Sequence, residues 1–134
     1  MTVALTKDSI DLGIVVTDPQ ASLKFYRDTL GFKSAGESPM PGGVTMYRLM
    51  CGTSMIKLVH PAKPPAATAP PGGIAGATGY RYWTISVSNL TEITDDCAAA
   101  GYKVVVPVRE VMPGLSISMV EDPDGNWVEF LQAG

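Results

Sequence analysis

The chain has 134 residues, of which 46% are hydrophobic and 17% charged, with a net charge of −3. This composition excludes a disordered chain, and the scattered Lys and Arg residues disfavour a nucleic-acid-binding surface. No apolar run approaches the roughly 18 residues of a membrane span, and the N-terminus lacks the pattern of a signal peptide. For this reason we expect no membrane partner. Cys51 and Cys97 have no CxxC spacing, so we expect free thiols in a reducing cytoplasm.

The first half of the chain begins with a strand and a helix. Asp18 is a typical N-cap residue, Pro19 suits the first helical position, and Gly31 can end the helix as a C-cap glycine. Ser22, Leu23, Tyr26 and Leu30 fall on one helical stripe. The pattern therefore predicts a helix after residue 18, and strands over 11–16, 44–50 and 54–60.

Residues 61–79 have the sequence PAKPPAATAPPGGIAGATG, which contains neither a helical nor a strand period. A Pro-, Ala- and Gly-rich stretch of this kind is typical of a linker. A long loop that covers a cavity is the alternative, because long loops inside compact domains are often functional.

The second half of the chain repeats the pattern of the first half. Ser88 and Asn89 can cap a helix over 90–100, which Gly101 ends. The Met112-Pro113-Gly114 and Asp122-Pro123-Asp124-Gly125 stretches are turn signals that separate strands. The expected strands are 82–87, 103–109, 115–121 and 127–132.

The two halves form an internal repeat. Ile14, Val16 and Asp18 correspond to Ile85, Val87 and Asn89, at an offset of about 71 residues. Each half is a βαβββ module that cannot bury its sheet alone. We therefore expect an α+β fold within one domain over residues 1–134. Two βαβββ modules, at about 8–60 and 80–134, form a curved mixed sheet around a concave cavity.

Two stretches of the chain resemble the vicinal oxygen chelate superfamily, which includes glyoxalases, bleomycin resistance proteins and extradiol dioxygenases. They are LGIVVTDPQASLKFYRDTLGFK (12–33) and VEDPDGNWVEFLQ (120–132). The resemblance implies a small-molecule ligand and a homodimer. It does not imply one reaction, because this fold carries many unrelated activities.

The resemblance also assigns four positions on the inner strands, where metal-binding members place their ligands. In this chain these positions hold Asp11, Lys57, Tyr82 and Glu129. Lys is a poor ligand when protonated, and its charge occupies the place of a cation. The chain has a single histidine, so a site with two histidines and a carboxylate cannot form. We expect no cofactor, although a weakly bound divalent metal is compatible with the two carboxylates.

The same four residues allow two interpretations. In the first, Asp11, Lys57 and Glu129 form a buried ion-pair network that only stabilises the fold. In the second they are catalytic: Glu129 acts as a general base on an acidic C–H, and Lys57 or Tyr82 stabilises the resulting oxyanion. A Schiff base between Lys57 and a carbonyl substrate is a further alternative.

Further side chains are candidates for substrate binding. Arg48 lies within a strand pattern, where it either reaches solvent or binds a carboxylate. Met46 and Met119 can form an adaptable apolar lining, and Trp83 can be a cavity wall, although ordinary core packing explains all three equally well. Arg81 should point away from Tyr82 because strand faces alternate.

Three functions remain open at this stage. The first is a metal-independent enzyme of the lyase or isomerase type that acts on a small carbonyl compound. The second is a ligand-binding protein of the bleomycin-resistance type without catalysis, which the absent metal ligands and the methionines favour. The third is a divalent-metal enzyme similar to glyoxalase or dioxygenase, which the ligand set disfavours.

Overall fold

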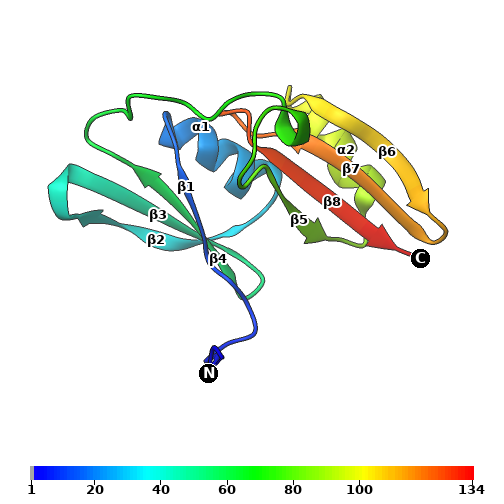
Figure 1. Cartoon of the computed structure of the whole chain (residues 1–134), viewed down its shortest axis with the longest axis horizontal. Helices are drawn as coiled ribbons and strands as arrows, with labels where there is room; N and C mark the ends of the chain where they lie inside the picture. Colours follow the sequence, from blue (N-terminus) through cyan, green and yellow to red (C-terminus); the bar gives the residue numbers. More distant parts are fainter. Residues whose placement is uncertain (1) are drawn as a thin grey trace. The chain divides into compact units, whose positions relative to one another are not determined.

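The computed structural model describes residues 2–134, and the chain divides into two units, Met1–Ala66 and Ala67–Gly134. Each unit contains one four-stranded sheet and a helix, and Figure 1 traces them in the order of the chain. None of the helices in the described chain is long and apolar enough to pass through a lipid bilayer.

Unit 1 has the element order strand, helix and three strands. A π-helical segment, Lys24–Thr29, continues α1, and a short 3-10 turn, Pro41–Gly43, joins β2 to β3. The main elements are β1 Leu12–Val15, α1 Pro19–Leu23, β2 Lys33–Met40, β3 Val44–Cys51 and β4 Ser54–His60.

Unit 2 repeats this order. Its loop before the first strand contains a 3-10 turn at Gly73–Ala75. The main elements are β5 Tyr82–Ser86, α2 Leu90–Ala99, β6 Val104–Met112, β7 Leu115–Glu121 and β8 Trp127–Ala133.

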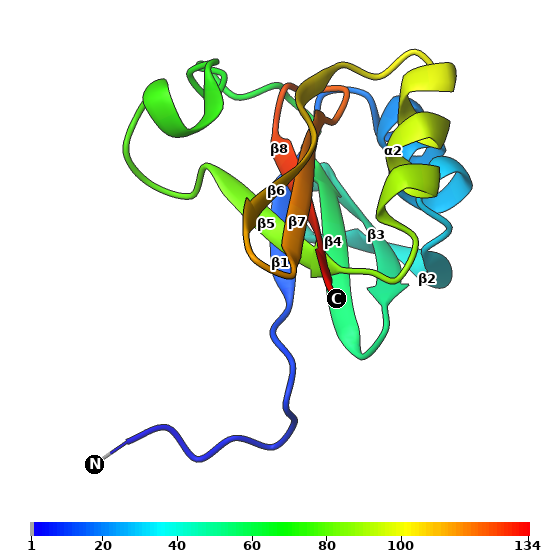
Figure 2. The same ribbon diagram turned by 90° about the vertical axis from the view of Figure 1, so that its right-hand side faces the viewer.

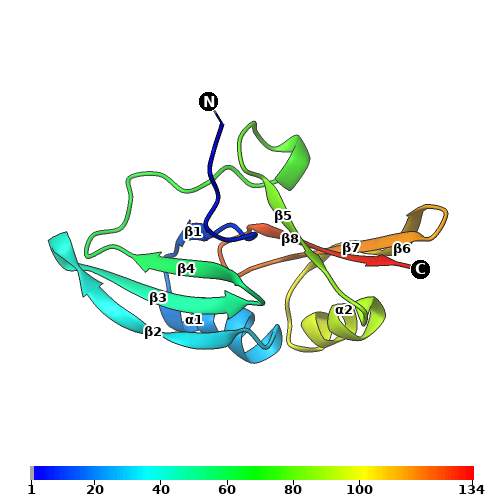
Figure 3. The same ribbon diagram turned by 90° about the horizontal axis from the view of Figure 1, so that it is seen from below.

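The two sheets have the same topology. The strand order is β1-β4-β3-β2 in unit 1 and β5-β8-β7-β6 in unit 2. In each sheet the first strand pairs in parallel with the last one, and the other pairs are antiparallel. Figure 3 shows the order of the strands in unit 1. The expected α+β fold with two βαβββ modules is therefore confirmed.

Each sheet buries one face against the helix of its own unit. In unit 1 the buried side chains are Leu49, Ile56 and Leu58 of the sheet and Leu23, Phe25 and Tyr26 of the helical segment. In unit 2, Val120, Val128 and Phe130 pack with the buried side of α2, which Figure 2 shows along one side of the sheet. Because side chains alternate along a strand, the intervening residues lie on the other face, which we call the open face.

The two helices begin differently. Asp18 caps α1 as expected, because its carboxylate accepts hydrogen bonds from the backbone N–H groups of Gln20 and Ala21 at 3.0 and 3.3 Å. Asn89 occupies the N-cap position of α2 but makes no capping bond through its side chain. Instead Gln132 of β8 accepts a hydrogen bond from the Leu90 N–H at 2.8 Å. The sequence predicted a cap from Ser88 or Asn89, but the side chain that caps α2 comes from the neighbouring strand β8.

Most elements lie within a few residues of their predicted bounds, but the sequence pattern did not locate β2. This strand is an edge strand whose residues are almost all exposed, so no buried alternation marks it. Gly36 adopts φ 101°, and the pairing register shifts between Ser34 and Glu37. Such an irregular edge gives no period of two in the sequence.

The Pro- and Gly-rich loop folds back onto unit 2. The Arg81 guanidinium donates hydrogen bonds to the carbonyl oxygens of Gly73 and Pro70, each at 2.6 Å. Gly73 is buried and lies against the indole of Trp127, where a Cβ atom would overlap the ring. The part of the loop around residues 70–76 is therefore ordered and not a free linker.

Gly76→Ala is expected to detach this loop. A Cβ at Gly76 would overlap the carbonyl oxygen of Pro71, which is a backbone atom and cannot move aside alone. We expect limited proteolysis within residues 67–79 to accelerate at least about tenfold, the change produced by a loss of about 1.4 kcal/mol of local stability. Ala75→Ser, at an exposed position of the same loop, is the control. Equal cleavage rates in both variants would contradict the packing of this loop.

Both cysteines are free, as expected, and Cys97 is fully buried. Burial raises the pKa of the Cys97 thiol to about 11, and the charge of Asp96 acts in the same direction. The folded state thus favours the neutral thiol over the thiolate. The resulting contribution to the free energy of unfolding is present in full at pH values below the usual thiol pKa of 9.0. It is lost as the pH rises from about 9 towards 11.

Urea unfolding between pH 8 and pH 10.5 tests this linkage. The free energy of unfolding of the wild-type protein should fall more steeply with pH than that of Cys97→Ala, because only the wild type carries the shifted thiol. Since other groups titrate in this range, the comparison uses the two slopes and not the absolute values. Identical slopes would contradict the shift.

Candidate functional site

Glu129 lies in the middle of β8 on the open face of unit 2, with 9% of its surface exposed. The parallel pairing of β5 with β8 places Thr84 beside it, and the Thr84 hydroxyl donates a hydrogen bond to Glu129 Oε1 at 2.7 Å. Within unit 2 no Lys or Arg nitrogen lies within 4.0 Å of this carboxylate. A buried carboxylate with one neutral hydrogen-bond donor and no cation of its own unit beside it lowers the stability of the fold, because its charge loses hydration without full compensation.

The neighbours of Glu129 on the open face are an apolar and an aromatic side chain. Met119 of β7 lies directly across from Glu129 and is 5% exposed. Tyr82 of β5 lies on the same face, across from Trp127, and is 47% exposed. The structure therefore places Glu129, Tyr82 and Met119 on the same face of one sheet, and their role in a site stays a prediction.

Trp83 lies on the other face of this sheet. It pairs with Val128, which is fully buried and packs on the α2 side. Because consecutive residues of a strand point to opposite faces, Trp83 is separated from the face that carries Glu129. Its placement corresponds to the ordinary core packing that the sequence had left as the alternative to substrate binding.

In unit 1 the structure brings Asp11 and Lys57 together. Lys57 Nζ lies 4.0 Å from Asp11 Oδ2, but Lys7 Nζ is much closer to Asp11, at 2.6 Å from Oδ1. The hydrogen bond from Lys7 lowers the pKa of Asp11, and the Met55 N–H and the charge of Lys57 add to the effect. Asp11 is thus ionised, and its main partner is the ammonium group of Lys7.

Arg48 and Met46 lie on the same open face of unit 1, on β3. Arg48 is directly across from Lys57, and Met46 is across from Val59. The Arg48 guanidinium donates a hydrogen bond to the hydroxyl of Ser38 at 2.6 Å. Both side chains are partly buried, so Arg48 does not simply extend into solvent.

The residues at the four ligand positions do not fit a divalent metal. In unit 1 the one carboxylate is bound by Lys7 and lies beside the ammonium group of Lys57, which repels a cation. In unit 2 the carboxylate of Glu129 accepts a hydrogen bond from Thr84, and Tyr82 lies on the same face of the sheet. Zinc, iron and their relatives require several His, Cys, Asp or Glu ligands, and no group of three such residues occurs over residues 2–134.

The turn before β8 is built around Asp122, which is 5% exposed. Its Oδ1 accepts hydrogen bonds from the N–H groups of Asp124 and Asn126, each at 2.9 Å. Its Oδ2 accepts one from the Asn126 side-chain amide, also at 2.9 Å. The Asp-Pro-Asp-Gly-Asn motif thus acts structurally, since it sets the start of the strand that carries Glu129.

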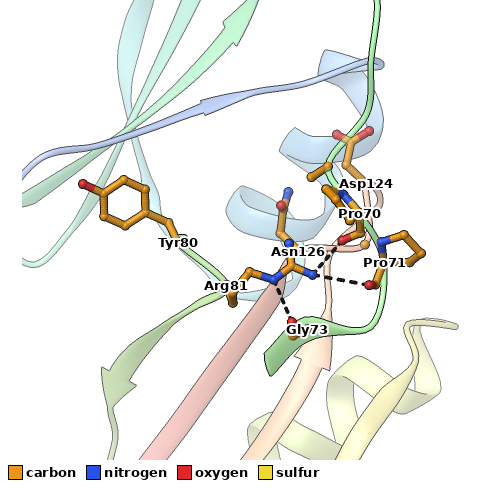
Figure 4. Close-up of a pocket in the computed structure, with 9 residues that line it drawn as sticks. Pro70, Pro71, Gly73, Tyr80, Arg81, Asp124 and Asn126 are labelled. Atoms are coloured by element: carbon orange, nitrogen blue, oxygen red, sulfur yellow. Dashed lines mark hydrogen bonds between the residues drawn. The ribbon is translucent and has the colours of Figure 1, made fainter. Parts of the chain in front are cut away.

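Two hollows lie beside the loop of unit 2. The smaller, of about 50 Å³, is shown in Figure 4 with Arg81 and Asn126 in its wall. The wider one, of about 550 Å³, is lined by Tyr80, Arg81, Tyr82 and the loop residues Ile74 and Ala77 to Gly79. Neither hollow is lined by Glu129, so the wider one reaches the predicted site only through Tyr82.

Sequence reasoning missed three residues that shape these sites. Thr84 binds Glu129, Ser38 binds Arg48, and Arg81 holds the loop. Thr84 could have been found, because it lies two residues after Tyr82 and must share its face. Ser38 could not, since the sequence pattern did not locate its strand. Arg81 was expected to point away from Tyr82, yet both residues line the wider hollow, and the loop contacts of Arg81 have no local sequence signal.

Comparison with characterised proteins gives relatives of low sequence identity. The chain is 29% identical over 117 residues to the protein named "Putative glyoxylase CFP32" of Mycobacterium bovis and to the protein of the same name in Mycobacterium tuberculosis. The matched region covers 87% of this chain and 42% of the relative. The chain thus spans about two fifths of the length of these curated relatives.

Solved structures support the same fold. The crystal structure of SMU.1112c has a TM-score of 0.74 at 25% identity and covers 95% of this chain and 99% of its own. A glyoxalase family protein from Bacillus cereus has a TM-score of 0.83 at 17% identity, with 98% and 96% covered. TioX from Micromonospora sp. ML1 has a TM-score of 0.72 at 21% identity, with 96% and 100% covered.

The family comparison covers nearly the whole chain. The region matched, residues 8–130, includes β1 to β4 of unit 1 and all of β5 to β7 together with most of β8, so both βαβββ units contribute. Residues 8–130 match the Glyoxalase/Bleomycin resistance protein/Dioxygenase superfamily, and the chain belongs to this superfamily.

Proposed function

We propose that this chain binds a small organic ligand and acts on it as a metal-independent enzyme of the lyase or isomerase type. The observation that carries the proposal is Glu129, a carboxylate that is 9% exposed on the open face of its sheet and lacks a cation within unit 2. Such a carboxylate is suited to remove a proton from a carbon next to a carbonyl group.

The arrangement gives each oxygen of Glu129 a separate task. Oε1 accepts the hydrogen bond from Thr84, which orients the carboxylate, whereas Oε2 accepts no hydrogen bond within unit 2 and is the atom that takes the proton. The phenol of Tyr82, on the same face, is the donor for the developing enolate oxygen. The proton leaves the carbon for Glu129 and returns to the same or a neighbouring carbon.

The first experiment is deuterium exchange, followed by proton NMR, into pyruvate, dihydroxyacetone and ethyl acetoacetate in heavy water. After dialysis against a chelator, the protein should still accelerate the exchange of at least one compound beyond free acetate at equal carboxylate concentration. Exchange that is lost on chelation and restored by added metal would contradict the metal-independent mechanism. Exchange no faster than with acetate for all three compounds would contradict catalysis.

Ligand binding without catalysis is the second candidate. It is favoured by the open face of unit 1, where Met46 lies across from Val59 and Met50 lies across from Met55, because methionines can adapt to an apolar compound. Saturable binding of a compound that undergoes no exchange would support this candidate. A homodimer in a reducing cytoplasm remains our expectation for either function, and sedimentation equilibrium tests the dimer.

A further inference from the structure

The distribution of charge along the chain is uneven. Unit 1 contains seven Lys and Arg and five Asp and Glu residues, a net charge of +2, although the chain as a whole has −3. Unit 2 contains three and eight, a net charge of −5. The positive charge of the chain is therefore concentrated in unit 1, and we ask which side chains there carry it.

Two of these cations face each other across neighbouring strands. Arg48 of β3 is in direct register with Lys57 of β4, so both side chains leave the sheet on the same face, a few ångströms apart. Like charges in this arrangement destabilise a sheet. Neither side chain escapes fully into water, since Lys57 is 37% exposed and Arg48 is partly buried.

The neighbouring groups neutralise this pair only in part. Within the described residues of unit 1, Asp11 is the only acid within 4.0 Å of Lys57 Nζ, and at 4.0 Å it is farther from Lys57 than from Lys7, which it contacts at 2.6 Å. The side-chain partner of Arg48 is the neutral hydroxyl of Ser38. On the open face, Lys33 of β2 adds another cation, across from Met50. The pair therefore retains positive charge that an anion would balance.

Apolar side chains flank the pair along the two strands. Met46 and Val59 lie across from each other on one side of it along the two strands, and Met50 and Met55 on the other side. Val15 of β1, across from Val59, is 56% exposed and extends this apolar surface. A charged centre within an apolar surface suits an amphipathic molecule better than a free inorganic ion.

We propose that Arg48 and Lys57 form the binding site for the acidic group of an apolar organic acid. The planar Arg48 guanidinium binds two oxygens of the acid, and Lys57 supplies a point charge from the neighbouring strand. This inference rests on the proposed function, since it names the class of ligand for that function as organic anions with an apolar body. Its binding step, however, is measurable without catalysis.

The test is isothermal titration of the full chain with naphthalene-2-carboxylate and with its neutral analogue, naphthalene-2-carboxamide. We expect the carboxylate to bind about tenfold or more tightly, because it adds charge-assisted hydrogen bonds to the same apolar contact. 2-Naphthyl phosphate forms a third arm. A preference for either anion over the amide supports the site, and the tighter anion identifies its acidic group.

Substitutions show which side chains cause the preference for the anion over the amide. Arg48→Met and Lys57→Met keep much of the side-chain length without the charge, and each should remove most of the preference for the anion while binding of the amide persists. Lys63→Met, at an exposed position of unit 1, is the matched control and should change neither affinity. Chemical-shift changes in the backbone amides of β3 and β4 show whether each variant remains folded and where the ligand binds.

Two outcomes would overturn the proposal. One is equal affinity of the wild-type protein for the anions and the amide, and the other is an anion preference that survives in the Arg48→Met/Lys57→Met double variant. Failure here is distinguishable from failure of the proposed function. Carbon-acid exchange that depends on Glu129 can persist without anion selectivity, and selective binding can persist without exchange.

Discussion

Replacing Glu129 by Gln should reduce the rate of carbon-acid exchange by about 10²–10⁴-fold, the usual contribution of a positioned general base. Gln keeps the size of the side chain and an oxygen that can accept the hydrogen bond from Thr84, so the fold should persist. It cannot take up a proton at neutral pH. The measurement is deuterium exchange into the most reactive carbon acid, with circular dichroism of the variant.

Two matched substitutions isolate this effect. Glu92→Gln removes a carboxylate from the exposed surface of α2 in the same unit and should leave the exchange rate unchanged. Thr84→Val removes the hydroxyl that orients Glu129 and should lower the rate less than Glu129→Gln, since the base itself remains. Exchange at the wild-type rate in a folded Glu129→Gln protein would exclude Glu129 as the base.

Asp122→Ala should lower the free energy of unfolding by roughly 2–4 kcal/mol, which is large for one substitution. The buried carboxylate accepts three hydrogen bonds, two from backbone N–H groups and one from Asn126, and alanine leaves these donors without their partner. Urea unfolding of the wild-type and variant proteins measures the loss in the free energy of unfolding. Asp95→Ala, on an exposed position of α2, is the control and should cost little.

A reciprocal exchange sharpens this prediction. Asp122→Asn can place its amide group against the amide of Asn126, so that two donors meet. Adding Asn126→Asp restores a donor and an acceptor in the reverse order. The double variant should therefore recover part of the stability that the single variant loses. A double variant whose loss is the sum of the two single losses would contradict a direct pairing of these side chains.

The fold could be predicted largely from local patterns in the sequence. Asp18 and Gly31 mark the ends of the first helical segment, and the Met112-Pro113-Gly114 turn joins β6 to β7. These signals work because caps, turns and strand alternation depend on neighbours only a few residues away. The edge strand β2 could not be predicted, because an exposed, irregular strand lacks that alternation.

The candidate site was predictable only in part. The resemblance grouped Tyr82 with Glu129, and strand pairing and alternation place both residues on one face of the sheet of unit 2, with Met119 across from Glu129. The same reasoning did not decide between the two faces for Trp83, since an aromatic residue is as suitable in a core as in a cavity wall. Its pairing with the buried Val128 decided that question.

The sequence by itself determined the superfamily fold and the two βαβββ units, whereas the assignment of Lys57 and Tyr82 to metal-ligand positions rests on the resemblance to the superfamily. Only the tertiary structure decided which polar groups meet. The bond from Thr84 to Glu129 and the register of Arg48 with Lys57 depend on the pairing of strands, whereas the contact of Lys7 with Asp11 joins residues only four positions apart. Thr84 and Glu129 are 45 residues apart, and no local preference of the chain specifies such a pair.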